Sequence, residues 1–288
     1  RPPIRDSDAV MADDVFVPGH YATTFRERVK RGFELGPKYY AVDLPRYFSQ
    51  RRKLKLPVLD WRALVNPIRS FRNNTYVTLP LPPHFDEALD LLGRAGIRFD
   101  NPRSRIAALA SLWWDVRASG GDAIECGAYR GATSIMLALL GQLNGLGQKV
   151  MMLDTFDGMP PPSEFDPSRQ AGELKPPQGW LDVIRTQLSE LGLTERVELH
   201  QGLFAESFPE LLRRKARFSF AHIDANIYEG TLDACRFTLP NMAAGGAVVF
   251  DDYNGLMDLG ARLAIDSYLS ASGQRPQPLA ECSAYLRT

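Results

Sequence analysis

From Asp122 onward, apolar runs of strand length alternate with segments of helical length, and this alternation constrains the fold more than any other feature. Strands that alternate with helices need crossover connections, so we expect one mostly parallel sheet with helices on both faces. Strands are predicted over residues 123–126, 150–153, 197–200, 218–223, 247–250 and 282–287, the last at an edge. Helices are predicted over 132–143, 180–191, 208–216, 228–237 and 257–269. The fold class is therefore α/β, with a doubly wound sheet.

The first hundred residues lack this alternation. They are expected to form an N-terminal, mainly helical extension (1–100) that supplies lid, acceptor or oligomer contacts to a domain spanning 101–288. Residues 1–18 are polar and acidic, which is typical of a poorly ordered terminus. Further helices are predicted over 25–33, 86–95 and 103–119, and a strand over 76–79.

Charge and cysteine content exclude several classes of protein. The 34 basic and 34 acidic residues balance, so no overall field favours nucleic acid or an anionic membrane as partner. Basic clusters at 26–31 and 51–55 fit a site for an anionic acceptor or, more commonly, a solvated face. No run has transmembrane length, and the three cysteines give neither a disulfide framework nor a zinc motif. We expect a cytoplasmic protein with a small-molecule partner; homo-oligomerisation is left open.

A glycine turn follows the first predicted strand. Gly127 and Gly131 allow the backbone to approach a ligand, and the next helix offers its N-terminal amides to a carboxylate. The glycines are four apart with Tyr129 between them, so this is not the dinucleotide fingerprint. The acid Glu125 before this looser turn fits S-adenosylmethionine better than a pyrophosphate. A tight turn that binds nothing explains the same residues equally well.

Asp154 ends the second predicted strand, where an acid accepts the two ribose hydroxyls of a nucleoside, or else caps a helix or turn. Residues 159–177 are rich in proline and lack periodicity, which predicts a lid or binding loop. Phe204 would cover the adenine or fill the core. The expected cofactor contacts are Glu125, Gly127, Tyr129, Gly131, Ser134, Asp154, Thr155, Phe156, Gly202, Phe204 and Asp224.

The fourth and fifth predicted strands end in the carboxylates Asp224, Asp251 and Asp252. Parallel strands open into one crevice, where clustered carboxylates repel one another unless they share a cation, a proton or a polar ligand. One such aspartate alone is more simply a turn or cap residue, but three together favour Mg²⁺ or another hard divalent cation. Asn226 would add a further oxygen ligand or contact the acceptor.

Two polar residues near these acids in the sequence, His222 and Tyr228, are candidates for a catalytic role. His222 lies on the same side of its strand as Asp224 but about 7 Å deeper, so we expect a buried histidine with satisfied hydrogen bonds rather than a general base. Tyr228 is expected to be more exposed and is a second candidate for a catalytic role, although an aromatic residue at the start of a helix more commonly serves packing. Cys126 is expected to be a small buried residue rather than a nucleophile.

Four motifs resemble the macrocin O-methyltransferase family, over about Arg103 to Thr288: 124–131 (IECGAYRG), 153–160 (LDTFDGMP), 222–229 (HIDANIYE) and 250–253 (FDDY). These are class I S-adenosylmethionine-dependent enzymes of natural-product tailoring, many of which methylate sugar hydroxyls with Mg²⁺. The resemblance implies a seven-stranded sheet with an antiparallel edge strand. It also implies cofactor at Gly127 and Asp154 and metal at Asp224, Asp251 and Asp252.

The chain departs from the family pattern in two places. The family has Asp-x-Asp after the fourth strand, whereas this chain has Asp224-Ala225-Asn226, and residues 1–100 do not match. The expected function is Mg²⁺-dependent methyl transfer from S-adenosylmethionine to a natural-product hydroxyl, on a sugar above all. Asp224 would bind the metal and offer a route for the acceptor proton. A metal-independent methyltransferase and a non-catalytic S-adenosylmethionine-binding module are the alternatives.

Overall fold

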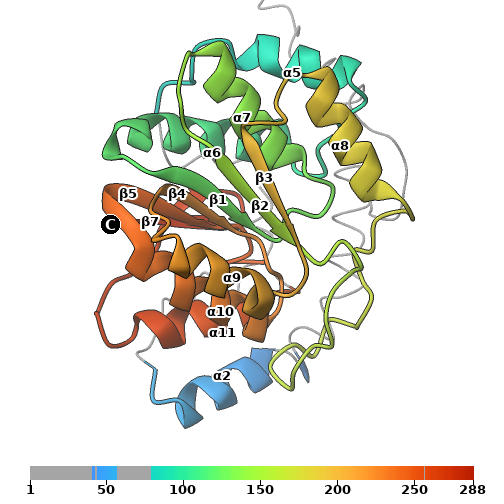
Figure 1. The fold of residues 1–288 in the computed structure, drawn as a ribbon. Coiled ribbons are helices and arrows are strands. Elements are labelled where there is room, and N and C mark those ends of the chain that lie inside the picture. Colours follow the sequence, from blue (N-terminus) through green and yellow to red (C-terminus); the bar gives the residue numbers. More distant parts are fainter. Residues whose placement is uncertain (1–40, 43, 57–78, 256) are drawn as a thin grey trace, which may run out of the picture.

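The computed structural model describes residues 41–42, 44–56, 79–255 and 257–288, and within them one seven-stranded sheet lies between two layers of helices (Figure 1). The strand order is β3-β2-β1-β4-β5-β7-β6. Neighbouring strands from β1 to β5 pair in parallel, and β7 pairs antiparallel with both β5 and β6. The strands are β1 Asp122–Cys126, β2 Val150–Asp154, β3 Val197–Gln201, β4 Phe218–Ile223, β5 Met242–Phe250, β6 Gln277–Ala280 and β7 Ser283–Arg287. The predicted doubly wound, mostly parallel sheet is confirmed.

Side-chain alternation along the strands divides the core into two layers. Ala123, Phe220 and Val249 point to one face, whereas their neighbours Ile124 and Val248 point to the other. The first face is covered by α5 Phe85–Arg94, α6 Arg103–Val116, α7 Ala132–Leu143 and α8 Trp180–Glu190. The second is covered by α9 Phe204–Arg213, α10 Tyr228–Thr238 and α11 Leu259–Leu269. Short 3₁₀ helices follow α6 (η2 Arg117–Ser119) and α10 (η3 Leu239–Asn241).

Helix α9, strand β5 and strand β7 differ from the prediction in ways that have a physical reason. Helix α9 begins four residues early, because the Glu206 carboxylate accepts the Leu203 N–H at 2.8 Å and so caps the helix. Strand β5 begins at Met242, where a register shift against β4 brings Gly246 so close that a Cβ would lie 2.7 Å from the Ser219 carbonyl oxygen. Strand β7 is antiparallel but internal, so its predicted edge position is wrong. The edge strand is β6, whose Pro278 lacks the N–H that an inner strand needs.

The sheet reverses its winding at β1. The chain runs outward from β1 through β2 to β3, then crosses back so that β4 pairs with the free side of β1. At such a reversal the two adjacent connections leave on opposite faces, and in doubly wound sheets ligands bind in the crevice expected there, at the carboxyl ends of the strands. The predicted glycine turn follows β1, and the predicted acids follow β4 and β5, so all of them lie at this end of the sheet.

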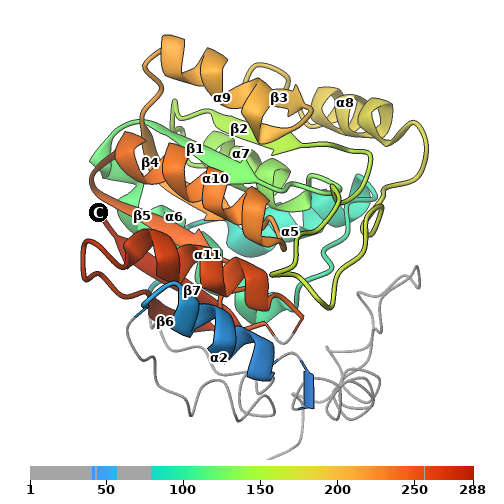
Figure 2. The same cartoon turned by 90° about the horizontal axis from the view of Figure 1, so that it is seen from below.

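The described part of the N-terminal extension packs against this domain. Helix α2 Leu44–Lys53 lies along α11 (Figure 2), with Leu44 and Tyr47 in one apolar cluster with Leu263. Between α2 and α11, the buried Asp266 carboxylate forms an ion pair with Arg51 and accepts hydrogen bonds from Tyr47 Oη (3.0 Å) and Tyr253 Oη (2.8 Å). Burial raises the pKa of Tyr47 to about 12 although Arg262 and Arg51 lower it.

The predicted solvated face at 51–55 is therefore wrong for Arg51, which is only 5% exposed, whereas Arg52, Lys53 and Lys55 are exposed. The predicted helix over 25–33 and the basic cluster at 26–31 lie outside the described residues, as does the predicted strand over 76–79 except for its last residue. Among the described helices, none combines the length and the apolar character that a membrane span requires.

Replacing Arg51 with methionine should lower the free energy of unfolding by about 3 kcal/mol, because the buried Asp266 charge then keeps only two hydroxyls and Arg262, whose Nε lies 3.9 Å away. Urea unfolding followed by tryptophan fluorescence measures the change. The matched control Arg52→Met, on the exposed side of the same helix, should stay within about 0.5 kcal/mol. Equal effects from the two substitutions would contradict this account of α2 docking.

Candidate active site

The glycine turn after β1 and the end of β4 are in direct contact. Gly127 has φ 96°, and a Cβ on it would lie 2.0 Å from the Asp224 backbone oxygen. The contact follows a strand-like hydrogen bond from Asp224 N to Cys126 O of 2.9 Å. Only glycine permits this approach, and it places the predicted cofactor turn and the first predicted acid in one crevice.

Asp154 connects the glycine turn to the end of β2. Its carboxylate accepts hydrogen bonds from the backbone N–H groups of Tyr129 and Phe156, both at 2.7 Å. The Gly202 N–H donates to the Asp154 backbone oxygen at 3.0 Å, which brings the end of β3 to the same place. Burial raises the pKa of Asp154 although these hydrogen bonds lower it. The side chain remains partly exposed, so it is available to a ligand at the crevice.

Several of the predicted cofactor contacts lie below the crevice surface. Glu125 is 2% exposed and its carboxylate binds the buried hydroxyl of Ser134 and the Nδ1 of His222. Phe156 packs in the core. Phe204 stacks on Phe208 with ring centroids 5.3 Å apart and remains partly exposed.

The remaining predicted contacts line the turns themselves. Thr155 Oγ1 donates to the Gly158 carbonyl oxygen at 2.8 Å, and Gly131 precedes α7 with φ 81°. The strand ends thus bring together Gly127, Tyr129, Asp154, Gly202 and Asp224, whereas Gly131 is buried and a Cβ on it would meet Met152 and Ile184. The binding of a cofactor by these residues stays a prediction.

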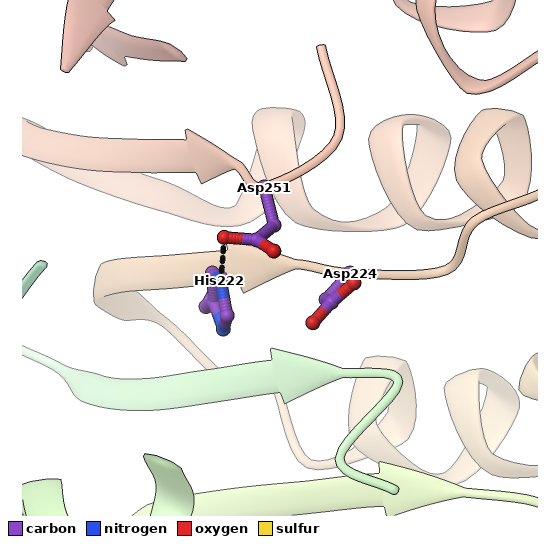
Figure 3. Close-up of side chains that lie close together, drawn as sticks. All are labelled: His222, Asp224 and Asp251. Atoms are coloured by element: carbon purple, nitrogen blue, oxygen red, sulfur yellow. Dashed lines mark ion pairs between the residues drawn. The ribbon is translucent and has the colours of Figure 1, made fainter. Parts of the chain in front are cut away.

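A chain of buried charges runs beneath the acids. Arg105 of α6 donates to Asp251 Oδ2 at 2.7 Å, and His222 Nε2 lies 3.5 Å from Asp251 Oδ1 (Figure 3). On its other side, His222 Nδ1 lies 2.8 Å from Glu125 Oε1. Burial works to raise the pKa of Asp251, but Arg105 and His222 outweigh it and lower that pKa to about 2. Asp251 is therefore a carboxylate at neutral pH.

The other two acids carry the opposite shift. Burial, followed by the charges of Asp251 and Asp252, raises the pKa of Asp224 well above its ordinary value. Burial together with Asp258 and Asp251 raises the pKa of Asp252 to about 7. These carboxylates are close enough to resist ionising together, which a bound cation would relieve.

Ligand atoms of His222, Asp224 and Asp251 all lie within 4.8 Å of one another, whereas the sequence predicted Asp252 in place of His222. Asp252 lies beyond the end of β5 and contacts Asp224, because, in addition to burial, its charge and a side-chain hydrogen bond between the two carboxyl groups help to raise the pKa of Asp224. One of its oxygens accepts a 2.6 Å hydrogen bond from Asn226 Nδ2. Asn226 thus contacts an acid of the site, at φ 58°.

His222 is the residue that sequence reasoning underestimated. Its burial is confirmed, and each ring nitrogen faces a carboxylate, with Nδ1 2.8 Å from Glu125 Oε1 and Nε2 3.5 Å from Asp251 Oδ1. The imidazole ring reaches beyond its own Cα position, so depth along the strand alone does not decide which groups His222 contacts. The sequence signal for this arrangement is that His222 and Asp224 are two residues apart, because residues two apart in a strand point to the same face of the sheet.

The loop over 159–177 is fixed beside the acids. Asp166 Oδ1 accepts the Tyr228 N–H at 2.8 Å and so caps α10, and the Phe165 ring lies 4.2 Å from the Tyr228 ring. Arg169 Nε donates to Asp258 Oδ1 at 2.9 Å. Tyr228 is buried by these contacts, so its predicted exposed position is wrong. The buried position predicted for Cys126 is confirmed.

Comparison with known proteins identifies the family. The model of the macrocin-O-methyltransferase (TylF) family matches residues 102–282. The chain belongs to this family. A tetracenomycin-type relative from Streptomyces olivaceus, the 8-demethyl-8-(2,3-dimethoxy-alpha-L-rhamnosyl)-tetracenomycin-C 4'-O-methyltransferase, is 30% identical over 143 residues, which is 46% of this chain and 53% of the relative. The match thus spans about half the length of that relative.

Two solved structures support the fold. The calicheamicin methyltransferase CalS11 has a TM-score of 0.59 and 19% identity, over 80% of this chain and 97% of CalS11. The O-methyltransferase NovP has a TM-score of 0.56 and 22% identity, over 64% of this chain and 78% of NovP. At these identities the likeness concerns the fold alone.

Gly127→Ala should destabilise the chain by about 2 kcal/mol more than Gly145→Ala. Both glycines have positive φ, but a Cβ at Gly145 meets no atom within 4 Å, whereas one at Gly127 overlaps the Asp224 carbonyl. Thermal and urea unfolding of the two variants measure the difference. Equal losses of stability in the two variants would contradict this account, because they would mean that position 127 requires glycine for its positive φ alone and not for the contact between β1 and β4.

Asp252→Asn should stabilise the metal-free protein increasingly as the pH rises from about 4 to about 8. The pKa of Asp252 is raised to about 7 in the folded chain, so in the wild type the free energy of unfolding falls as the pH passes from the ordinary value of 3.8 to 7. Asparagine does not titrate, and its advantage at high pH should reach roughly 1 kcal/mol or more. Urea titrations with a chelator present measure it, with the exposed Asp90→Asn as control. An advantage that does not vary with pH would contradict the raised pKa.

Proposed function

We propose that this chain is an S-adenosylmethionine-dependent O-methyltransferase that acts on a sugar hydroxyl of a natural product. The observation that carries the proposal is the contact between Gly127 and the Asp224 carbonyl, because it joins a cofactor-type glycine turn to an acidic strand end. Membership of the macrocin-O-methyltransferase family supplies the reaction class.

The proposed cofactor site extends along the ends of β1, β2 and β3. The turn from Gly127 to Gly131 and the first amides of α7 would hold the carboxylate of the cofactor, since a helix N-terminus favours a negative group. Asp154, held by two backbone N–H groups, would accept the ribose hydroxyls. When bound, S-adenosylmethionine supplies the activated methyl group. The protein's part is to orient that group toward the acids of β4 and β5.

The residues present fit a divalent cation. Asp251 Oδ1 is buried, with His222 Nε2 3.5 Å away, and burial together with the neighbouring acids Asp251 and Asp252 raises the pKa of Asp224. Asp224 and Asp251 would hold Mg²⁺ or another divalent ion, which lowers the pKa of a bound hydroxyl. Asp224, partly exposed at the crevice, would also accept the acceptor proton. Asn226, which stands where the family has a second acid, would hold Asp252 by its hydrogen bond.

The proposed acceptor class rests on the curated relative. That protein is named for methylation of a rhamnosyl 4'-hydroxyl on a tetracenomycin. A neutral, hydroxyl-rich sugar suits a crevice in which the acids need a cation and oxygen ligands. The loop over 159–177, anchored through Asp166 and Arg169, lies where it would cover such a ligand.

Calorimetric titration with S-adenosylhomocysteine, followed by turnover on rhamnosylated polyketides, tests the proposal. The wild type should bind the nucleoside with or without Mg²⁺ and methylate only with a divalent ion. Asp224→Asn should keep nucleoside affinity within about threefold and lose at least about 10²-fold in kcat, because a proton acceptor is removed. Turnover unaffected by a chelator would favour the metal-independent enzyme. Nucleoside binding without methylation of any acceptor would favour a binding module and overturn the proposed activity.

A further inference from the structure

We propose that helix α2 positions the acid turn, the segment from Asp251 to Gly255, and that Arg51 is a positioning residue for the reaction. The connection runs from Arg51 through the Asp266 carboxylate to Tyr253. This role goes beyond the proposed function, on which it rests for its kinetic readout. It gives the described part of the N-terminal extension a task on the acceptor side of the site.

One buried carboxylate joins α2 to the acid turn. Tyr253 directly follows Asp252 and is buried, and its hydroxyl donates to Asp266 Oδ1 at 2.8 Å. The other oxygen, Asp266 Oδ2, accepts a hydrogen bond from Tyr47 Oη at 3.0 Å and forms the ion pair with Arg51. Because both oxygens are bound, the Asp266 side chain is held in one orientation, which fixes the place of the Tyr253 hydroxyl.

The two partners on α2 form one unit. Tyr47 and Arg51 are four residues apart in the helix, so both lie on the face that packs on α11. Arg51 Nη1 also donates to Tyr47 Oη at 2.7 Å. Helix α2 therefore presents a hydroxyl and a guanidinium to Asp266 in a fixed mutual arrangement.

Arg262 of α11 explains why the charge of Arg51 matters to the turn. Its Nη1 donates to Asn254 Oδ1 at 3.0 Å, and its guanidinium carbon lies 4.7 Å from the centroid of the Tyr253 ring. Within the described part of the chain, Arg51 and Arg262 are the two cations that pair with Asp266, and Arg262 Nε is 3.9 Å from Oδ2. Without Arg51, the buried Asp266 charge would draw Arg262 toward itself and away from Asn254, since a buried ion needs a partner.

The acid turn depends on these side-chain contacts because it lies beyond the end of β5. The backbone N–H groups of Asp251 and Asn254 donate to carbonyl oxygens outside the turn, at 3.0 Å and 2.8 Å. Tyr253, between these two points, ties the turn to α11 through Asp266. A shift of Tyr253 would therefore move the neighbouring carboxylate of Asp252.

Helix α2 also contacts the loop over 159–177. Leu44 and Tyr47 share an apolar cluster with Tyr228, and Phe165 of the loop packs against that cluster. Helix α2 lies over α11 on the β5 and β7 side of the sheet (Figure 2), whereas the glycine turn follows β1. Disturbing α2 should therefore affect the acceptor side and leave nucleoside binding intact.

Hydrogen exchange followed by mass spectrometry tests the positioning without any substrate. Arg51→Met should speed amide exchange about tenfold or more in peptides that cover 251–255, because the turn then opens locally. Peptides that cover the glycine turn, 123–131, should exchange as in the wild type. Arg52→Met, at an exposed position of the same helix, should change neither. Leu92→Ala, at a buried residue of α5 on the other face of the sheet, serves as a control for lost stability and should not affect 251–255 selectively.

Steady-state kinetics with a rhamnosylated polyketide tests the consequence for the reaction. Arg51→Met should lower kcat about tenfold or more while acceptor KM and S-adenosylhomocysteine affinity stay within about threefold, because displaced acids lose contacts made in the transition state. Leu92→Ala should keep kcat within about twofold, measured where both variants are folded. Tyr253→Phe keeps α2 docked and removes only the hydroxyl, so it decides even if Arg51→Met does not fold. It should reproduce both changes, and adding Arg51→Met to it should lower kcat little further.

Exchange at 251–255 that is unchanged in both Arg51→Met and Tyr253→Phe would overturn the positioning of the acid turn by α2. Faster exchange throughout the chain, as from a general loss of stability, would overturn it as well. Faster exchange confined to 251–255 with an unchanged kcat would overturn the role of Arg51 in the reaction. A wild type that methylates no acceptor would contradict the proposed function, whereas exchange confined to the turn would still support its positioning by α2.

Discussion

The structure of the crevice depends on one close contact, the approach of Gly127 to the Asp224 carbonyl. Parallel pairing of β1 with β4 brings the two chain segments together, and the missing Cβ lets them touch. A side chain there would push the end of β4 away from β1 and separate the acids from the glycine turn. In the proposed reaction, the methyl donor and the acceptor would meet across this contact.

Charge compensation organises the space beneath that contact. Arg105 offsets Asp251, and His222 lies between Glu125 and Asp251, so the buried groups of both signs alternate from α6 to β1. Burying an ion is tolerated only when partners replace its water. Asp252 accepts a hydrogen bond from Asn226, but burial and neighbouring acids outweigh the groups that lower the pKa of Asp224 and of Asp252, and both pKa values rise. The fold thus holds one carboxylate firmly ionised next to two that favour a cation.

Much of the fold was predictable because β-strand and helix periods are read from local sequence. The predicted strand over 218–223 and the predicted helix over 132–143 match β4 and α7 at both ends. Strand β6 was not predicted, because Pro278 is a poor strand signal and its pairing with β7 is set by tertiary contacts. The early start of α9 depended on a single capping carboxylate, that of Glu206.

The site was predictable as a location more than as a set of contacts. Asp224, Asp154 and Gly127 occupy the crevice because a strand end fixes where a residue lies. The sequence alone does not show whether the Glu125 side chain faces solvent or His222. Its direction depends on tertiary contacts with His222 and with Ser134 of helix α7. The role of Arg51 was missed for a similar reason, because Asp266 is distant in sequence and neither position alone predicts an ion pair.

Transfer of a labelled methyl group from S-adenosylmethionine to a rhamnosylated polyketide, measured after chelation and again after a divalent ion is restored, tests the central claim most directly. Our account predicts no transfer by the chelated protein and full recovery when the ion returns, with the label on a sugar hydroxyl. Undiminished transfer after chelation would contradict the metal's part in it, and no transfer under any condition would contradict the proposed activity itself.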